Sequence, residues 1–338
     1  MTRTAKNLIV TLANNAYADQ AKQLFASAYL RAGWKGDYLL LAHELNEANL
    51  NSFKNRGIKI YKTRPLDTNP SLGGYQPIVL SKFYLFKEYF KKWDTIIFLD
   101  ADIIVNGSLE DVLDLKGFNA PRAESFNLKN EFINDKRILQ DLGLTTKYDL
   151  KQAAFTTGLL VFETDLIQPE TFFNLLSLYQ QNKAALKFSE ESTLNLFYYK
   201  QWQELSVIYN FNPQYMHWLY NAIPKNNLPI IYHFFCFQKP WEKDSDYYQV
   251  WLNNLASFEN INFNSPVKEI IGIDPKELNN YLDYLKKKEK LAPLFRIKKL
   301  LFKIFIAQID RRLGLLGLYI KKINPKLYQK ISLKKSGN

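Results

Sequence analysis

The sequence Thr95-Ile96-Ile97-Phe98-Leu99-Asp100-Ala101-Asp102 sets a short apolar run directly before two carboxylates. Such a run, without polar alternation, is typical of a strand buried on both faces in a parallel sheet. Ligands of open α/β sheets bind beyond the carboxyl ends of the strands, where these two aspartates would lie. Residues i and i+2 of an extended chain point to the same side, so both carboxylates are predicted to face one point. The motif favours a site for a divalent cation and substrate phosphates, and the alternative is a solvated acidic turn.

The segments around this strand alternate between strand-like and helix-like patterns. Strands are predicted at residues 7–12, 38–41 and 58–61, and helices at 17–31, 46–55 and 78–90, with Gly33 ending the first helix. Further along, we predict a strand over 155–162 that is interrupted at residues 156–158, helices over 169–180 and 190–199, and a strand over 229–237. The alternation predicts an α/β protein with a mostly parallel sheet covered by helices.

Size and cysteine content restrict the class of protein. The chain has 338 residues, of which 47% are hydrophobic, and it can bury a sizeable core. Its one cysteine, Cys236, excludes an internal disulfide and a cysteine-rich metal site, which fits a reducing compartment. The N-terminal apolar run is too short for a signal-peptide core, and no stretch approaches the ~18 apolar residues of a spanning helix. We therefore expect a cytoplasmic protein.

The positive charge is concentrated at the C-terminal end. Lys286 to Asn338 holds 16 Lys and Arg against 2 Asp and Glu, a net charge of +14, which leaves −2 on the other 285 residues. We expect a body over 1–260, a linker and helix over 261–285, and a basic amphipathic extension over 286–338. Such an extension favours a peripheral position on the anionic inner face of the cytoplasmic membrane. The alternatives are a helix packed on the body, or a nucleic-acid-binding tail. Because the extension offers little stacking chemistry, we expect no nucleic acid.

Five further segments carry polar residues suited to a phosphate or sugar ligand. They are Thr11-Leu12-Ala13-Asn14-Asn15-Ala16-Tyr17, Ser81-Lys82-Phe83, Phe155-Thr156-Thr157-Gly158, Glu190-Glu191-Ser192-Thr193-Leu194-Asn195 and His233-Phe234-Phe235-Cys236-Phe237-Gln238-Lys239-Pro240-Trp241. Together with Asp100-Ala101-Asp102, they resemble the family-8 retaining glycosyltransferases, the group of glycogenin and bacterial lipopolysaccharide glucosyl- and galactosyltransferases, over roughly residues 7 to 260. The resemblance implies a GT-A fold, which is a Rossmann-like α/β fold, a UDP-sugar donor, and Mn²⁺ or Mg²⁺.

The resemblance also implies a role for each matching residue. The metal would be held by Asp100, Asp102 and His233, and the diphosphate would be bound by Lys82 and Lys239. The remaining positions assigned to the nucleotide sugar are Leu12, Asn14, Asn15, Tyr17, Ala101, Thr156, Thr157, Gly158, Asn195 and Cys236. Two of them depart from the family pattern, since Thr156 replaces an asparagine and Cys236 a glycine.

The acidic pair Glu190 and Glu191 lies where the family has Asp-Gln. We hypothesise that Glu190 holds the donor sugar and that Glu191 stabilises the oxocarbenium-like transition state from below the ring. The two roles exchange if the register shifts by one, and both residues can instead be helix N-terminal acids. The predicted activity is retaining transfer of a hexose to a glycan or glycolipid acceptor, in lipopolysaccharide or surface-polysaccharide synthesis. The competing hypotheses are a nucleotide-sugar-binding protein without transfer activity and a nucleic-acid-binding protein.

Overall fold

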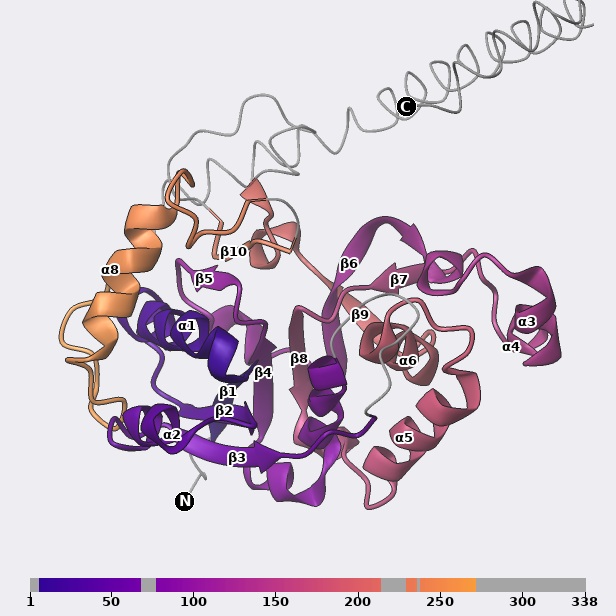
Figure 1. Cartoon of the computed structure of the whole chain (residues 1–338), viewed down its shortest axis with the longest axis horizontal. Coiled ribbons are helices and arrows are strands. Elements are labelled where there is room, and N and C mark those ends of the chain that lie inside the picture. Colours follow the sequence, from indigo (N-terminus) through magenta and orange to yellow (C-terminus); the bar gives the residue numbers. More distant parts are fainter. Residues whose placement is uncertain (1–5, 68–76, 214–228, 236–237, 272–338) are drawn as a thin grey trace, which may run out of the picture. The chain divides into compact units, whose positions relative to one another are not determined.

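The computed structural model describes residues 6–67, 77–213, 229–235 and 238–271, all of which belong to one unit, Met1–Leu278. The predictions for the basic extension and for Cys236 therefore concern residues outside the described part of the chain. Figure 1 shows a central sheet with helices packed around it. Within the described ranges, none of the helices has the length and apolar character needed to span a bilayer.

An eight-stranded mixed sheet forms the centre of the unit, in the order β3-β2-β1-β4-β8-β6-β7, with β9 also paired to β6. Strands β1 to β4 are mutually parallel, and β8 then runs antiparallel to both β4 and β6. All five residues of β4 are buried, as predicted for a strand covered on both faces. The strands are β1 (Asn7–Ala13), β2 (Asp37–His43), β3 (Lys59–Thr63), β4 (Thr95–Leu99), β6 (Phe118–Asn127), β7 (Ala153–Phe155), β8 (Leu159–Glu163) and β9 (Trp202–Leu205).

Helices flank this sheet, and those at residues 18–32, 47–54, 171–182 and 189–197 lie close to predicted helices. They are α1 (Ala18–Ala32), α2 (Glu47–Lys54), α3 (Lys136–Asp141), α4 (Leu144–Lys147), α5 (Thr171–Asn182), α6 (Ser189–Phe197) and α8 (Tyr248–Phe258). As predicted, Gly33 ends α1, with a left-handed φ of 62° that glycine adopts without steric cost. Helix α8 packs on α1, far from it in sequence.

The predicted α-helix over 78–90 is wrong in type. The structure has two 3₁₀ helices there, Pro77–Phe86 and Glu88–Lys92, separated by extended Lys87 at φ −87° and ψ 150°. Phe83, Leu85 and Phe86 are fully buried, so core packing covers more than one side of the first 3₁₀ helix. An i, i+3 apolar spacing fits a 3₁₀ helix as well as an α-helix, and the sequence pattern therefore did not separate them.

The predicted strand over 155–162, interrupted at residues 156–158, is divided at that interruption into β7 and β8. Strand β7 pairs with β6, whereas β8 pairs with β4 and β6, and the chain crosses between them at residues 156–158. The predicted strand over 229–237 is shorter than expected and comprises β10 (Ile231–His233). It forms a separate antiparallel pair with β5 (Ile103–Val105). These two features decide where the site residues lie.

Candidate active site

The two aspartates lie in the turn that joins β4 to β5. Both lie outside the strands, and Ala101 and Asp102 occupy the turn itself, so the extended geometry expected for this motif is wrong. Their carboxylates nevertheless converge, because the chain reverses at the carboxyl edge of the sheet. The pairing of β5 with β10 sets His233 opposite Ile103, and the Phe234 N–H donates to the Asp102 carbonyl at 3.1 Å. This small sheet is what brings the histidine to the aspartates.

Asp100, Asp102 and His233 each offer a ligand atom, and these atoms all lie within 4.8 Å of one another. Two carboxylates and an imidazole form a ligand set suited to Mn²⁺, and they leave coordination positions for phosphate oxygens. The Asp100 side chain is 32% exposed whereas that of His233 is 2% exposed, so the carboxylate side of the cluster faces solvent. The cluster fits the cation that the resemblance implied.

The His233 ring has neighbours that fix its orientation. Its Nε2 lies 3.3 Å from Asp102 Oδ1, and its Nδ1 lies 2.7 Å from Oδ1 of Asn210. Gly158 lies against the ring, since a Cβ at this position would stand 2.0 Å from His233 Cε1. A side chain at position 158 would push the imidazole away from the aspartates. Sequence reasoning missed Asn210 and assigned Gly158 to the sugar.

Two lysines neutralise the aspartates. Lys82, 3% exposed, lies 3.1 Å from Asp100 Oδ1 and 3.1 Å from Glu190 Oε1. Lys239 lies 2.7 Å from Asp102 Oδ2. Burial alone would lower the pKa of Lys82, but the charges of Asp100 and Glu190 outweigh it and raise that pKa. Lys82 therefore stays charged within the site.

The pKa values of the two aspartates are shifted in opposite directions. Burial raises the pKa of Asp100, and the charge of Lys82 only partly opposes the effect. Burial also acts on Asp102, but His233 and Lys239 outweigh it and hold its pKa well below the usual range. Asp102 is therefore the carboxylate that stays ionised across the physiological range.

Thr157 connects both glutamates at the start of α6. Its backbone N–H donates to Glu191 Oε2 at 2.9 Å, and its hydroxyl lies 3.2 Å from Glu190 Oε1 and 3.3 Å from Glu191 Oε2. Lys82 also donates to the Thr157 hydroxyl at 3.2 Å. Burial and the adjacent Glu190 charge raise the pKa of Glu191. One crossing segment therefore connects the acidic pair to the candidate metal ligand Asp100, because the Asp100 N–H donates to the Gly158 carbonyl at 2.8 Å.

Asn195 supports this segment from α6. Its Oδ1 accepts from the Phe155 N–H at 2.9 Å, and its Nδ2 donates to the Phe155 carbonyl at 2.8 Å and to the Glu191 carbonyl at 3.0 Å. The amide thus holds the end of β7 against the helix. Thr156 begins the crossing, with its N–H donating to the Pro121 carbonyl at 2.9 Å.

The predicted nucleotide loop follows β1, which is parallel to β4, so it reaches the same edge of the sheet. Leu12 is buried at the end of the strand, and the Asn14 side chain caps the following 3₁₀ turn by accepting from the Tyr17 N–H at 3.2 Å. Asn15 bridges to residues 44, 46 and 49. Tyr17 is 39% exposed and meets Trp241 edge-on, with ring centroids 6.4 Å apart. The exposed Tyr17 ring is the group of this loop best placed to stack on a base.

Sequence reasoning also missed a buried carboxyl group, that of Glu131, which lies close to the acidic pair. Glu131 is 1% exposed, and it accepts a hydrogen bond from the Ser192 hydroxyl at 3.1 Å. Burial and the charge of Glu191 raise the pKa of Glu131 well above its usual value. Its sequence context carries no signal for this position, since only the packing of α6 over residues 128–131 creates it.

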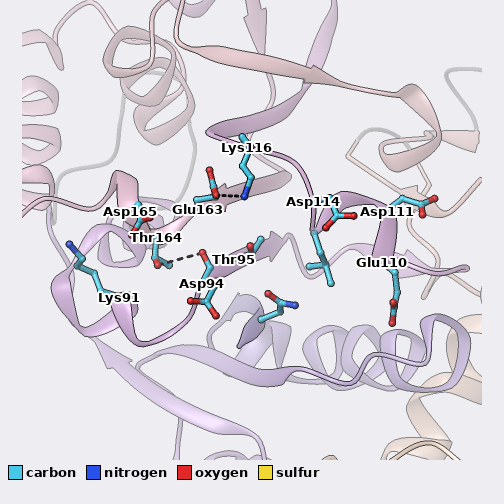
Figure 2. A pocket seen from close by; sticks show the side chains of 12 residues that line it. Lys91, Asp94, Thr95, Glu110, Asp111, Asp114, Lys116, Glu163, Thr164 and Asp165 are labelled. Carbon is cyan, nitrogen blue, oxygen red and sulfur yellow. Dashed lines mark hydrogen bonds and ion pairs between the residues drawn. The ribbon is translucent and has the colours of Figure 1, made fainter. Parts of the chain in front are cut away.

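A cavity of about 740 Å³ lies at the opposite end of β4, away from these residues. Figure 2 shows the acidic side chains around it and the ion pair between Lys116 and Glu163. Its lining residues are Asn7, Lys91, Asp94, Thr95, Glu110, Asp111, Leu113, Asp114, Lys116, Glu163, Thr164 and Asp165. None of the predicted site residues is among them, so cavity size does not locate the chemistry here.

The α/β sheet with its flanking helices has the GT-A fold of glycosyltransferases. The family model for glycosyl transferase family 8 matches residues 9–245, more than half of the sequence, and the chain belongs to this family. The predicted fold and the predicted class of enzyme, a glycosyltransferase, are thereby confirmed.

Curated relatives share part of this chain. Glycosyltransferase GlyF of Streptococcus pneumoniae serotype 4 is 24% identical over 169 residues, which are 48% of this chain and 37% of GlyF. Glycosyltransferase GlyE of the same strain is 25% identical over 160 residues, or 45% of this chain and 34% of GlyE. The matched region therefore spans little more than a third of either relative.

Solved structures share the fold at low sequence identity. The galactosyltransferase LgtC, in complex with donor and acceptor sugar analogs, gives a TM-score of 0.56 at 16% identity, covering 74% of this chain and 95% of LgtC. The apo form of GlyE from Streptococcus pneumoniae gives 0.53 at 18% identity, covering 76% of this chain and 63% of that chain. These likenesses establish the architecture of the sheet and its helices.

Proposed function

We propose that this protein is a metal-dependent retaining glycosyltransferase that moves a hexose from a UDP-sugar to a glycan or glycolipid hydroxyl. The observation that carries the proposal is the convergence of Asp100, Asp102 and His233 within 4.8 Å at the carboxyl edge of a GT-A sheet. Lysines stand on both sides of this cluster, and a pair of glutamates lies across from it. The cationic groups suit the negative charge of a leaving diphosphate. The two carboxylates suit the positive charge that develops on the sugar ring.

The leaving diphosphate is the part of the donor that this site stabilises. A divalent cation held by Asp100, Asp102 and His233 would supply positive charge to its oxygens. Lys82 and Lys239 add two further charges that need no reorganisation, since each is already fixed by an aspartate. Negative charge that grows on the phosphate as the glycosidic bond breaks meets these fixed groups, which lowers the barrier.

The acidic pair acts on the sugar. Glu190, fixed by Lys82 and Thr157, holds a hydroxyl of the donor sugar, in the role of the family's aspartate. Glu191, fixed by the Thr157 N–H, stabilises positive charge on the ring carbon and oxygen from the face opposite the leaving group. The acceptor oxygen bonds to the ring carbon on the face that the diphosphate leaves and passes its proton to a departing phosphate oxygen, which retains the anomeric configuration.

The charge distribution of the chain supports an acceptor that is embedded in a membrane. The extension over residues 286–338 carries a net charge of +14, whereas the rest of the chain is near neutral. We infer an anionic membrane partner and a glycolipid acceptor, as in lipopolysaccharide or surface-polysaccharide synthesis, with the enzyme peripheral on the inner face of the cytoplasmic membrane. Flotation with anionic liposomes should require residues 286–338, and a chain truncated at Leu285 that floats equally well refutes this part of the proposal.

The first test of the proposed function is binding and hydrolysis of donors. The melting temperature should rise with UDP and rise further when Mn²⁺ is added, and GDP- and CMP-sugars should have smaller effects. Slow hydrolysis of one UDP-sugar should require the metal and stop in EDTA. Stabilisation by UDP without any hydrolysis or transfer would favour a binding protein, and full activity in EDTA would contradict the metal-dependent scheme.

A further inference from the structure

We propose that Asn210 is a positioning residue that keeps the proton of His233 on Nδ1 and so leaves the Nε2 lone pair for the cation. The inference rests on the proposed function and adds to it a residue outside the short sequence segments that carry the resemblance. Asn210 follows the 3₁₀ turn Val207–Tyr209 and has no metal-ligating atom in the cluster itself.

The hydrogen-bond partners of the ring lead to this assignment. Nδ1 lies 2.7 Å from Oδ1 of Asn210, and Nε2 lies 3.3 Å from a carboxylate oxygen of Asp102. Both neighbouring atoms are acceptors, but the neutral imidazole, which is the form that binds a cation, has only one N–H to donate. With the proton on Nδ1, the Nε2 lone pair and the Asp102 oxygen face each other, and a cation between them is what makes that arrangement favourable. Outer hydrogen bonds of this kind fix the tautomer of metal-bound histidines.

The backbone holds Asn210 at this distance. The Phe211 N–H donates to the Ile231 carbonyl at 3.0 Å, and the His233 N–H donates to the Phe211 carbonyl at 2.9 Å. The residue after Asn210 is thus bonded to β10 on both sides of Tyr232, and one of these two bonds is to His233 itself. Gly158 touches the ring, and the Phe235 ring lies 5.0 Å from it, so the imidazole cannot turn freely away from the amide.

If the Asn210 amide were reversed, the proton of His233 would lie on the other ring nitrogen. If Nδ2 of Asn210 donated to a bare Nδ1, the proton would move to Nε2 and point at Asp102, and the ring could not bind a cation through that nitrogen. Replacement by aspartate separates the two arrangements, because a carboxylate accepts a hydrogen bond and cannot donate one. Leucine, which is similar in size, removes both possibilities.

The experiment measures Mn²⁺ affinity of the full chain by electron paramagnetic resonance, so it does not depend on turnover. Asn210→Leu should weaken binding by about 10- to 100-fold, and Asn210→Asp should stay within about threefold of wild type or bind more tightly. Asn182→Leu is the matched control, because it removes another buried asparagine, at the end of α5, and should leave the affinity unchanged. Wild-type affinity in Asn210→Leu, or a comparable loss in Asn210→Asp, overturns the proposal.

A second measurement uses the wild-type chain and does not depend on variants that fold. The protein is labelled with ¹⁵N-histidine, and the NMR signals of the His233 ring are assigned by their loss in His233→Gln. A proton on Nδ1 supports the proposal, and a bare Nδ1 overturns it. The two proposals fail differently. Wild-type protein that binds no Mn²⁺ contradicts the proposed function, whereas normal Mn²⁺ binding with a bare Nδ1 contradicts only the role of Asn210.

Discussion

Acidic side chains gather at both ends of β4, but their surroundings differ. At the carboxyl end, Asp100 and Asp102 are fixed by a buried lysine, an imidazole and a second lysine. At the amino end, the carboxylates around the 740 Å³ cavity are mostly solvated, and their ion pairs include the exposed contact of Lys116 with Glu163. Burial with partners, rather than the count of carboxylates or the volume of the hollow, distinguishes a site that can do chemistry.

The largest expected effect comes from removing one carboxylate at the carboxyl end. Asp102→Ala should lower metal-dependent donor hydrolysis by about 10²- to 10³-fold or more, because it removes a ligand and leaves Lys239 without its anion. The matched change at the other end, Asp165→Ala, should leave hydrolysis unchanged. Assays of both variants under saturating Mn²⁺ check the comparison, and equal losses would mean that the two acidic regions do not differ as described.

The next effect concerns the acidic pair. Glu191→Gln should lower kcat by about tenfold or more, since an amide cannot stabilise a developing positive charge as a carboxylate does. Because the pKa of Glu191 is raised, the wild-type rate should rise as pH increases through that pKa, and this rise should be absent in the variant. A pH profile of kcat for both proteins provides the measurement. Turnover that stays within about threefold of wild type at every pH would remove any charge-based role for Glu191.

A smaller effect is expected from filling the space beside the imidazole. Gly158→Ala places a methyl group where His233 Cε1 lies, so the ring must move. Mn²⁺ affinity should fall by about tenfold, and the melting temperature without metal should change less than affinity does. Gly143→Ala serves as the control, because its neighbours leave space for a Cβ and it lies between α3 and α4, although its φ of 66° costs some stability. Unchanged Mn²⁺ binding in Gly158→Ala would show that the ring is not confined by this contact.

The smallest effect is one of stability. The native state holds a proton on Glu131 to a higher pH than the unfolded chain does, because its pKa is raised from the ordinary value of 4.5. Above that value the free energy of unfolding should therefore fall as pH rises, with a slope of at most about 1.4 kcal/mol per pH unit from this group. Glu131→Gln should remove this contribution and be the more stable form at neutral pH. Urea unfolding of both proteins across pH tests it, and parallel curves would contradict the assignment.

Local patterns made the first half of the sheet predictable from sequence. The alternation from β1 to β4 follows from apolar runs and glycine breaks, and the aspartates are recognisable because they end a buried strand. The resemblance of residues 233–241 to a family motif provided the candidate third ligand, His233, and the second lysine, Lys239. These assignments depend on neighbours in sequence, which is why they could be made without coordinates.

The rest of the site depends on pairings between distant segments. Asn210 meets His233 only because Phe211 bonds to β10, and Gly158 meets the same ring only because the chain crosses from β7 to β8 at that point. Glu131 is buried by the packing of α6. None of these contacts follows from local periodicity or from residue type, and the same holds for the 3₁₀ geometry around Lys82, which apolar spacing did not separate from an α-helix.

The central claim is that one cation is shared by the β4–β5 turn and β10. The most direct measurement is an anomalous diffraction map of crystals grown with Mn²⁺ and UDP. The account predicts one manganese peak in contact with Asp100, Asp102 and Nε2 of His233, at about 2.0–2.3 Å from each ligand atom. Two results would contradict a shared cation. One is a map with UDP bound and no manganese at these three residues, and the other is manganese bound among the acidic side chains at the other end of β4.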